Sequence, residues 1–279
     1  MALRKLDLVN VPIIDFCARI GMDEVMLRGL SSVATLQLNG VRSPAWLLEY
    51  SLDSFAGLSA VGPVIELPAT IKRSVPARQA SFLFGRAAAA AATCLHAKLG
   101  SFRTIPIGTQ GAPIWPTGIT GSITHTNTHA VAWAERCDAT YCGIDLEQIL
   151  TPRDALALWG QIMAYDEAEQ LRHALGPAGF HLGVTLLFSA KEASYKALFP
   201  LVKRAMDFHE LALVAIDIDQ AQLRLQVRDA AIIDHNVPAM IEVGFGSLSG
   251  SILTHTAVPR PSGHPAHPGA RPEARRVSR

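Results

Sequence analysis

The sequence has little of what marks a protein held together by disulfides or a structural metal. Its 279 residues include only four cysteines, and no two of them form a C-x-x-C pair. This argues against a zinc ribbon and against a thioredoxin-like redox site. Buried free thiols in a reducing cytoplasm are the simpler interpretation. No run of about 18 apolar residues is uninterrupted, and charges stand close to the N-terminus, so we expect neither a transmembrane helix nor a signal peptide.

A strong charge of one sign is also missing. The formal net charge is +1, which excludes a strongly basic nucleic-acid binder as the first hypothesis. The last 21 residues, 259–279, hold five Arg and one Glu among Pro and His, and we expect this basic tail to be disordered. With 49% apolar and 18% charged residues, the chain has the composition of one large globular domain or two small ones.

Three widespread catalytic and nucleotide-binding motifs are absent. The chain contains no G-x-x-x-x-G-K-[ST] phosphate-binding loop, no G-x-G-x-x-G dinucleotide motif and no G-x-S-x-G nucleophile elbow. The first two motifs place glycine backbone against phosphates, and the third exposes a serine on a sharp turn. The usual ATP-binding, dinucleotide-binding and hydrolase sites are therefore not expected.

Two segments predict long helices. The first is the alanine-rich run from Arg78 to Leu99, which Gly100 follows as a stop signal. The second runs from Leu186 to Leu198; Ser189 and Glu192 in it have capping-box spacing, and Pro200 follows. Strand-like runs cover 122–126, 130–133, 141–147, 211–216, 223–227, 239–245 and 251–258, and helical pieces cover 151–175. The order of helix then strands occurs twice, and Gly121–Thr126 is faintly echoed by Gly250–Thr256, which favours an α+β fold of two related halves.

Asp145 and Glu147 lie two residues apart in the predicted strand 141–147. Side chains alternate along a strand, so both carboxylates point to one face. Paired carboxylates suit a hard cation such as Mg²⁺. A D-x-E sequence also occurs often by chance, and a solvated strand face is the alternative.

Lys191, Glu192 and Lys196 lie in the second predicted helix. Glu192 and Lys196 are four residues apart and share a face. The simplest interpretation of such a pair is a surface ion pair worth a few tenths of a kcal/mol. The apolar residues on both sides of this stretch favour a functional site instead, because charges inside an apolar frame often mark one.

The segment from Gly121 to Thr126 places Thr124 and His125 after a glycine turn. Hydroxyls beside a histidine suit an anion such as phosphate. The spacing of His125 and His129 also suggests zinc, but no Cys or Asp lies close in sequence to complete that site.

In this order the motifs resemble those of the 4′-phosphopantetheinyl transferases, in particular the monomeric Sfp-like type and its enterobactin-synthase-component-D branch. The resemblance runs from about Lys72 to Pro259 and rests on Arg78…Gly85-Arg86, Gly111-Ala-Pro-Ile-Trp115-Pro116, Gly118-x-x-Gly121-Ser-Ile-Thr-His125, Gly143-Ile-Asp145-Leu-Glu147 and Phe188-Ser-Ala-Lys191-Glu192-Ala-x-Tyr195-Lys196. The combination is far more specific than any of its parts. One departure stands at Gln110–Ala112, where relatives often carry a basic residue.

The resemblance implies a fold of two similar α/β halves related by a pseudo-twofold, with coenzyme A bound between them. We expect an N-terminal half at 1–140, a C-terminal half at 141–258 and the tail at 259–279. The implied activity transfers the 4′-phosphopantetheine arm of coenzyme A to a serine of an apo acyl, peptidyl or aryl carrier protein, releases 3′,5′-ADP and requires Mg²⁺. The alternative is a non-catalytic relative that binds coenzyme A or the carrier.

The resemblance also implies residue roles. Asp145, Glu147 and Glu192 would hold Mg²⁺, and Lys191 and Lys196 would contact coenzyme A phosphates. Arg78, Arg86, Thr124 and His125 would bind the 3′-phosphoadenosine end. Glu192 or a water on the metal would be the base, and Lys196 would stabilise the departing phosphate.

We expect a monomeric cytoplasmic enzyme whose partners are coenzyme A and apo carriers, with no nucleic acid and no membrane. Carriers of fatty-acid, polyketide and siderophore synthesis remain alternatives. The region from Trp159 to Phe180, which includes Met163, Leu171, Arg172 and Leu175, is a candidate carrier-binding surface. Packing of these side chains into the core is the alternative.

Overall fold

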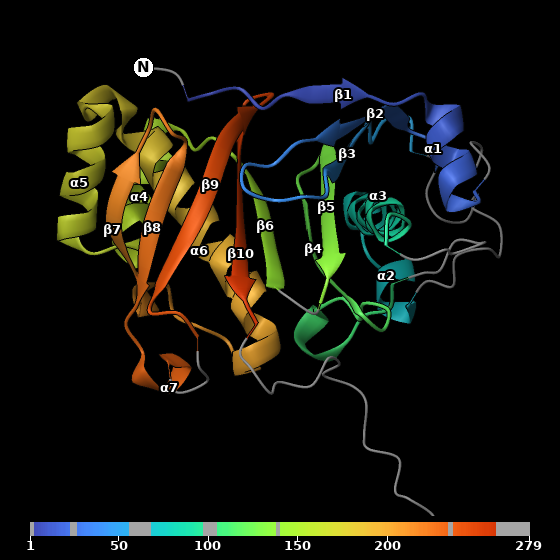
Figure 1. Cartoon of the computed structure of the whole chain (residues 1–279). Coiled ribbons are helices and arrows are strands. Elements are labelled where there is room, and N and C mark those ends of the chain that lie inside the picture. Colours follow the sequence, from blue (N-terminus) through green and yellow to red (C-terminus); the bar gives the residue numbers. More distant parts are fainter. Residues whose placement is uncertain are drawn as a thin grey trace, which may run out of the picture.

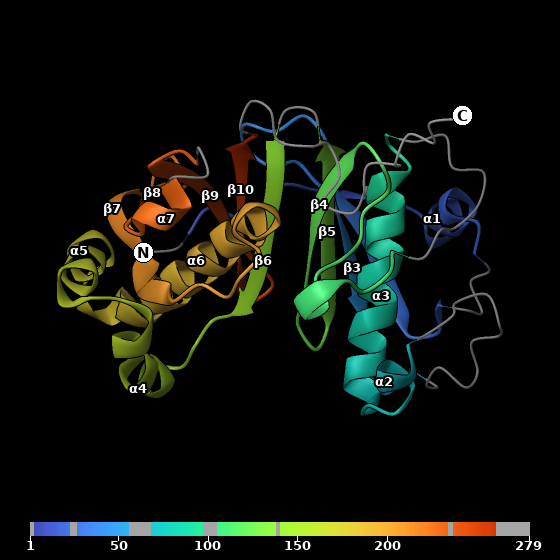
Figure 2. The same cartoon turned by 90° about the horizontal axis from the view of Figure 1, so that it is seen from below.

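Two five-stranded antiparallel sheets form the body of the protein, and one long helix packs against each (Figures 1 and 2). The structure is a computed structural model and describes residues 3–22, 27–55, 68–96, 105–137, 140–233 and 237–260. Most of the predicted basic tail, 261–279, lies outside the described residues. None of the described helices combines the length and apolar character that crossing a bilayer would require.

The N-terminal sheet has the strand order β1-β2-β3-β5-β4. Its strands are β1 (Leu8–Asn10), β2 (Leu30–Leu36), β3 (Ala45–Tyr50), β4 (Ile119–His125) and β5 (His129–Arg136), and its helices are α1 (Ile13–Ile20), α2 (Ala69–Lys72) and α3 (Pro76–Thr93), with the 3₁₀ turn η3 at Thr109–Gly111. The alanines of α3 are buried and let this helix lie close to β3, β4 and β5. Phe84 of α3 stacks on Tyr50 of β3.

The C-terminal sheet has the order β6-β10-β9-β8-β7. Its strands are β6 (Thr140–Gln148), β7 (Leu211–Asp217), β8 (Gln222–Val227), β9 (Met240–Leu248) and β10 (Ser251–Pro259), and its helices are α4 (Pro152–Ile162), α5 (Tyr165–Leu175), α6 (Phe180–Val202) and α7 (Ala230–Ile233), with 3₁₀ turns η4 (Pro177–Gly179) and η5 (Phe208–Glu210). Helix α6 lies on β6 and β10. A Cβ on Gly143 of β6 would lie 1.9 Å from the carbonyl oxygen of Ala193, so helix and strand touch backbone to backbone.

The two halves meet where β4 and β6 run side by side (Figure 1). Ser122 Oγ donates to the Ile144 carbonyl at 3.4 Å, and Leu146 N donates to Thr124 Oγ1 at 3.0 Å. Because these contacts advance together along both strands, β4 and β6 are parallel. Beside them, apolar side chains of β2, β3, β5, β6, β9 and β10 form a core shared by the two halves, which includes Trp133 of β5. Strand β6 is thus flanked by the edge of one sheet and by its own partner β10.

The strand predictions agree with the structure to within three residues, but both helix predictions differ at their ends. The alanine-rich helix ends at Thr93 rather than Leu99. Helix α6 begins at Phe180, directly after Gly179, and continues past Pro200 to Val202. The capping-box prediction for Ser189 is wrong, because Ser189 lies inside the helix and its hydroxyl bonds with Thr254 Oγ1 of β10 at 2.9 Å.

Candidate active site

Asp145 lies at the centre of the junction between the halves. Its side chain is buried, and Oδ1 accepts hydrogen bonds from Thr124 Oγ1 of β4 at 3.2 Å and from Lys196 Nζ of α6 at 2.6 Å. Its second oxygen, Oδ2, is buried without a partner among the described residues. A buried carboxylate oxygen without a partner is costly unless something else satisfies it, so this atom points to a further ligand.

Lys196 is the cation of this cluster. Nζ donates to Asp145 and also to the Ile144 carbonyl at 3.2 Å, and its side chain remains 27% exposed. A partly exposed ammonium on a flexible stem can move toward another anion without unfolding its helix. Lys196 therefore can serve either Asp145 or an anionic ligand.

Glu147 and Glu192 complete a cluster of three carboxylates. Burial, together with the nearby Asp145 and Glu192 carboxylates, raises the pKa of Glu147 to about 7, although Lys196 acts in the opposite direction. Burial also raises the pKa of Glu192, with Lys196 and Asp145 acting in opposite directions. Carboxylates that raise one another's pKa lie close together, and a divalent cation would relieve their repulsion.

Whether these residues fit a metal ion is decided by their chemistry. Within the described ranges, no three Asp, Glu, His or Cys side chains are already arranged as a metal-binding group. The donors are nevertheless all oxygens, the type that Mg²⁺ prefers, and Mg²⁺ completes its shell with water and substrate phosphates. Together with the unpartnered Oδ2 of Asp145, Asp145, Glu147 and Glu192 fit such an ion.

Arg78 and His125 form a second, cationic part of the site. Arg78 at the start of α3 lies with Nη1 3.1 Å from Nε2 of His125 at the end of β4. Partial burial lowers the pKa of His125, and the nearby Arg78 and Lys196 cations lower it further. A neutral imidazole accepts a hydrogen bond from the guanidinium, which holds Arg78 beside the end of β4.

Arg86 lies two turns further along α3 and is buried. Its guanidinium lies 4.8 Å from the centre of the Phe82 ring, a cation–π contact, and Nε has no partner among the described residues. Burial, and then Arg78, lower its pKa to about 10. An unpartnered buried donor beside a second arginine suits an anion.

Two predicted site residues have other surroundings than expected. The Thr124 hydroxyl is used between β4 and β6, where it donates to Asp145 and accepts from Leu146 N. Lys191 is 1% exposed and paired with Glu167 of α5, so the structure does not bring it to the carboxylate cluster. The zinc alternative is not supported either, since buried His129 bonds through Nδ1 with its neighbour Thr128.

The candidate carrier-binding region is largely core. Met163, Leu171 and Leu175 are buried in the core of the C-terminal half. This agrees with the alternative that these side chains pack into the core. Arg172 pairs with Glu169 at 2.7 Å, and its guanidinium lies 4.1 Å from the centre of the Phe180 ring. These residues hold α5 against α6, whereas Tyr165 at the start of α5 stays 69% exposed.

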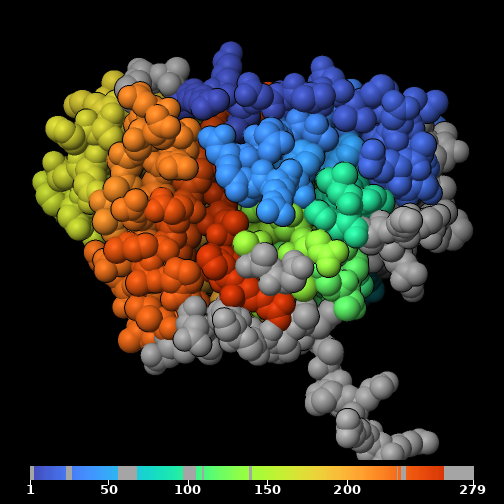
Figure 3. Space-filling model, viewed as in Figure 1, coloured from blue at the N-terminus to red at the C-terminus, as the bar shows by residue number. Residues whose placement is uncertain are grey.

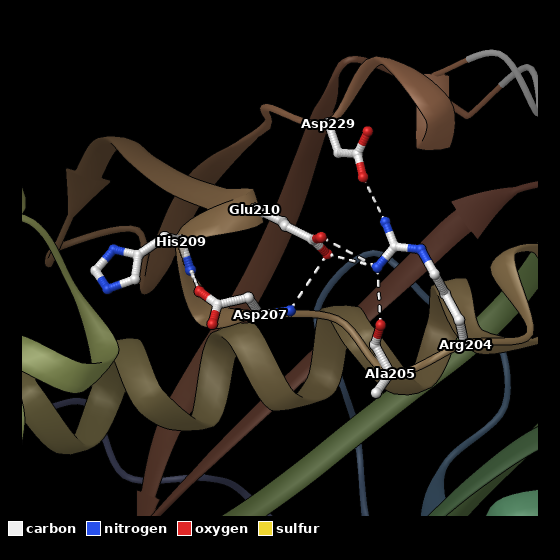
Figure 4. A network of polar contacts seen from close by, with 6 residues as sticks. All are labelled: Arg204, Ala205, Asp207, His209, Glu210 and Asp229. Atoms are coloured by element: carbon white, nitrogen blue, oxygen red, sulfur yellow. Dashed lines mark hydrogen bonds and ion pairs between the residues drawn. The ribbon is translucent and has the colours of Figure 1, made fainter.

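A polar network fixes the chain where α6 ends (Figure 4). Lys203 adopts a left-handed conformation that terminates the helix. Arg204 Nη1 then binds both Glu210 oxygens at 3.0 Å, and Nη2 binds Asp229. Glu210 also accepts from Asp207 N. The network ties the end of the helix that carries Glu192 and Lys196 to the start of β7 and to the segment after β8.

A pocket of about 800 Å³ lies between the halves but contains none of the predicted site residues. It is lined by Gly40–Ser43, His96, Trp133, Glu135, Arg136, Thr140 and Ala257. Trp133 belongs to the core on the face of β6 opposite to Asp145. Figure 3 shows the molecule from the side where the blue, green and red segments that line it meet.

Comparison with known proteins gives a match in each half of the chain. Residues 67–135 match the family model described as the 4′-phosphopantetheinyl transferase N-terminal domain. Residues 141–239 match the 4′-phosphopantetheinyl transferase superfamily. The two matches contain all nine predicted site residues and adjoin at the β5–β6 connection.

Individual relatives agree with the family models. Enterobactin synthase component D of Salmonella typhimurium is 41% identical over 122 residues, 43% of this chain and 48% of the relative. 4′-Phosphopantetheinyl transferase Npt of Nocardia iowensis is 36% identical over 183 residues, 64% of this chain and 74% of the relative. Svp of Streptomyces mobaraensis is 32% identical over 206 residues, 71% and 79% of the two chains. The match thus spans about half of the first relative, and 74% and 79% of the other two.

Proposed function

Because this chain belongs to the 4′-phosphopantetheinyl transferase superfamily, we propose that it transfers the 4′-phosphopantetheine arm of coenzyme A to a serine of an apo acyl, peptidyl or aryl carrier protein. The observation that carries the proposal is the meeting of three carboxylates and Lys196 at the contact between β6 and α6. A phosphoryl-transfer site needs both signs of charge at one place, since the metal and the phosphates must be held together.

The cationic end of the site is proposed to bind the 3′-phosphoadenosine part of coenzyme A. Arg78 is exposed and already oriented by His125, and Arg86 carries an unpartnered donor. Guanidinium groups suit phosphate because their donors form a fixed fork. Gln110, which is exposed in the turn η3, belongs to the stretch where relatives often carry a basic residue.

The carboxylates are proposed to hold Mg²⁺, with Asp145, Glu147 and Glu192 as the protein ligands. Oxygen donors with raised pKa values and the unpartnered Oδ2 of Asp145 support this assignment. When bound, Mg²⁺ would neutralise the pyrophosphate and so lower the barrier to attack on phosphorus.

In the proposed transfer the carrier serine oxygen forms a bond to the phosphorus next to pantetheine, and the bond from that phosphorus to the bridging oxygen breaks. The serine proton goes to Glu192, whose raised pKa makes its carboxylate a stronger base than an ordinary glutamate. Lys196 donates to the departing phosphate of 3′,5′-ADP, for which its partial exposure leaves it free to move.

The test is intact-mass analysis of apo carriers from fatty-acid, polyketide and siderophore systems after incubation with the protein, coenzyme A and Mg²⁺. We expect a phosphopantetheine mass gain on at least one carrier, and we expect EDTA to abolish it. Coenzyme A binding without any mass gain would contradict the proposal and favour a non-catalytic relative.

The proposal also covers the setting of the enzyme. We propose a cytoplasmic monomer without nucleic-acid or membrane partners, which the net charge of +1 and the absence of spanning helices in the described ranges support. Light scattering of the purified chain, alone and with a modified carrier, tests the monomer.

A further inference from the structure

Lys191 and Glu167 form an ion pair inside the C-terminal half. Lys191 Nζ lies 2.9 Å from Glu167 Oε1, and both side chains are 1% exposed. Successive residues of a helix are about 100° apart, so Lys191 points away from the carboxylate cluster to which its neighbour Glu192 belongs. The lysine of the K-E pair in α6 is therefore turned into the core toward α5.

Every polar atom of this pair is used to join elements. Glu167 Oε1 also accepts from Leu213 N of β7 at 2.8 Å, and Oε2 accepts from Ala164 N before α5 at 2.7 Å. Lys191 also donates to the carbonyl of Ile162, the last residue of α4, at 2.8 Å. One ion pair thus connects α4, α5, α6 and β7.

The candidate active site depends on the orientation of α6. Glu192 and Lys196 project from α6 toward Asp145 of β6, and the helix rests directly on the strand at Gly143. A small rotation of α6 about its axis would move the Lys196 ammonium away from Asp145. An anchor one residue from Glu192, on another side of the helix, limits this rotation.

We propose that Lys191 is a positioning residue, which holds α6 in register through Glu167, and that it does not contact the phosphates of coenzyme A. The inference rests on the proposed transferase function and differs from the phosphate role that the sequence motif implies for this lysine. The two roles make opposite predictions for a variant in which both charges of the pair are removed.

A variant that lacks both charges of the Lys191–Glu167 pair distinguishes the two roles. Lys191→Met alone leaves the Glu167 carboxylate buried without its counter-ion, which is strongly destabilising, whereas removal of both charges is often tolerated. Lys191→Met/Glu167→Gln keeps side chains of similar length and keeps an acceptor for Leu213 N, and the one hydrogen bond from Ala164 N is lost. If Lys191 only positions α6, the double variant recovers the stability and the activity that Lys191→Met loses. If Lys191 binds phosphate, the double variant still lacks the cation.

The experiment compares wild type, both single variants and the double variant by thermal unfolding, by calorimetric binding of coenzyme A and by kcat and KM for coenzyme A. We expect Lys191→Met to lower the unfolding midpoint and kcat, and the double variant to recover both, with Kd and KM for coenzyme A within about threefold of wild type. Arg224→Met, in the exposed pair with Glu242, is the matched control and should change nothing.

Recovery of the midpoint with Kd and KM raised by about tenfold or more would overturn the proposal, because that split is the signature of a lost phosphate contact. Unchanged midpoint and kcat in both single variants would overturn it as well. If Lys191→Met fails to fold, the double variant alone still distinguishes the two roles. The binding and unfolding measurements do not depend on turnover, so they remain informative even if no carrier is modified.

Discussion

Nζ of Lys196 lies 2.6 Å from Oδ1 of Asp145, and the pair bridges α6 and β6 at the edge of the N-terminal half. The carboxylate is 3% exposed and the ammonium 27%. Any cation that binds Asp145 must therefore compete with this ammonium, and any phosphate that attracts Lys196 releases the carboxylate. In the proposed enzyme, binding of metal and binding of coenzyme A are thereby favourably coupled.

Replacement of Lys196 by Met should separate metal binding from catalysis. We expect Mn²⁺, as a probe for Mg²⁺, to bind about tenfold more tightly at pH 8 without coenzyme A, since the competing charge is gone. Transfer should fall by a factor of about 10² or more, because the departing phosphate loses a donor. Electron paramagnetic resonance measures the free Mn²⁺. Weaker Mn²⁺ binding in this variant would show that Lys196 does not compete for the carboxylate.

Asp145→Asn should abolish transfer while the protein stays folded. The amide keeps the shape and an acceptor for Thr124 but loses the charge on which the proposed metal site depends. We expect a loss of about 10³ or more in kcat/KM, on the scale of lost electrostatic stabilisation. Thermal unfolding provides the control. Activity within about tenfold of wild type, at saturating Mg²⁺, would exclude Asp145 as a required ligand.

The pKa of Glu147 predicts how stability depends on pH. In the folded chain it is raised to about 7 from an ordinary value of 4.5. Between these values the folded state retains a proton that the unfolded state has lost, so the free energy of unfolding falls as pH rises through this window. Urea unfolding at several pH values should show the fall, and Glu147→Gln should flatten it. An equally steep fall in Glu147→Gln would assign the effect to another group.

The sequence predicted which residues of the candidate site share a face, but not the contacts that hold their helix and strand in place. Asp145 and Glu147 share a face because strand alternation is local, and Glu192 and Lys196 share one because helix spacing is local. The pairs that hold these elements are not local. Lys191 of α6 pairs with Glu167 of α5. Nothing in the sequence around Glu167 distinguishes it from an acidic residue at the exposed start of a helix.

The start of α6 could not be predicted for the same reason. Ser189 has the spacing of a helix cap, yet it is buried inside the helix because Thr254 of a distant strand accepts or donates its hydrogen bond. Gly183 lies inside α6, and a Cβ there would lie 3.0 Å from the Leu171 Cβ, so the glycine serves the close packing of α5 on α6. Tertiary contact overrides local propensity at both positions.

Gly143→Ala tests whether close contact between β6 and α6 is required for the site. Its Cβ would lie 1.9 Å from the Ala193 carbonyl oxygen, which is backbone and cannot turn aside. Helix α6 must therefore move outward, and Glu192 and Lys196 move with it. We expect destabilisation by about 3 kcal/mol, at the upper end for overpacking, and loss of most transfer activity.

Gly160→Ala is the matched control for that prediction. Gly160 lies in α4, and a Cβ there meets nothing within 4 Å. Alanine at a helical position is favoured over glycine by about 0.5–1 kcal/mol, so this variant should be slightly more stable and fully active. Chemical unfolding of both variants and of wild type measures the difference in stability. Transfer rates show whether each substitution also changes the site. A Gly143→Ala protein as stable and active as Gly160→Ala would mean that α6 can shift on β6 without cost, and the close contact would then have no part in building the site.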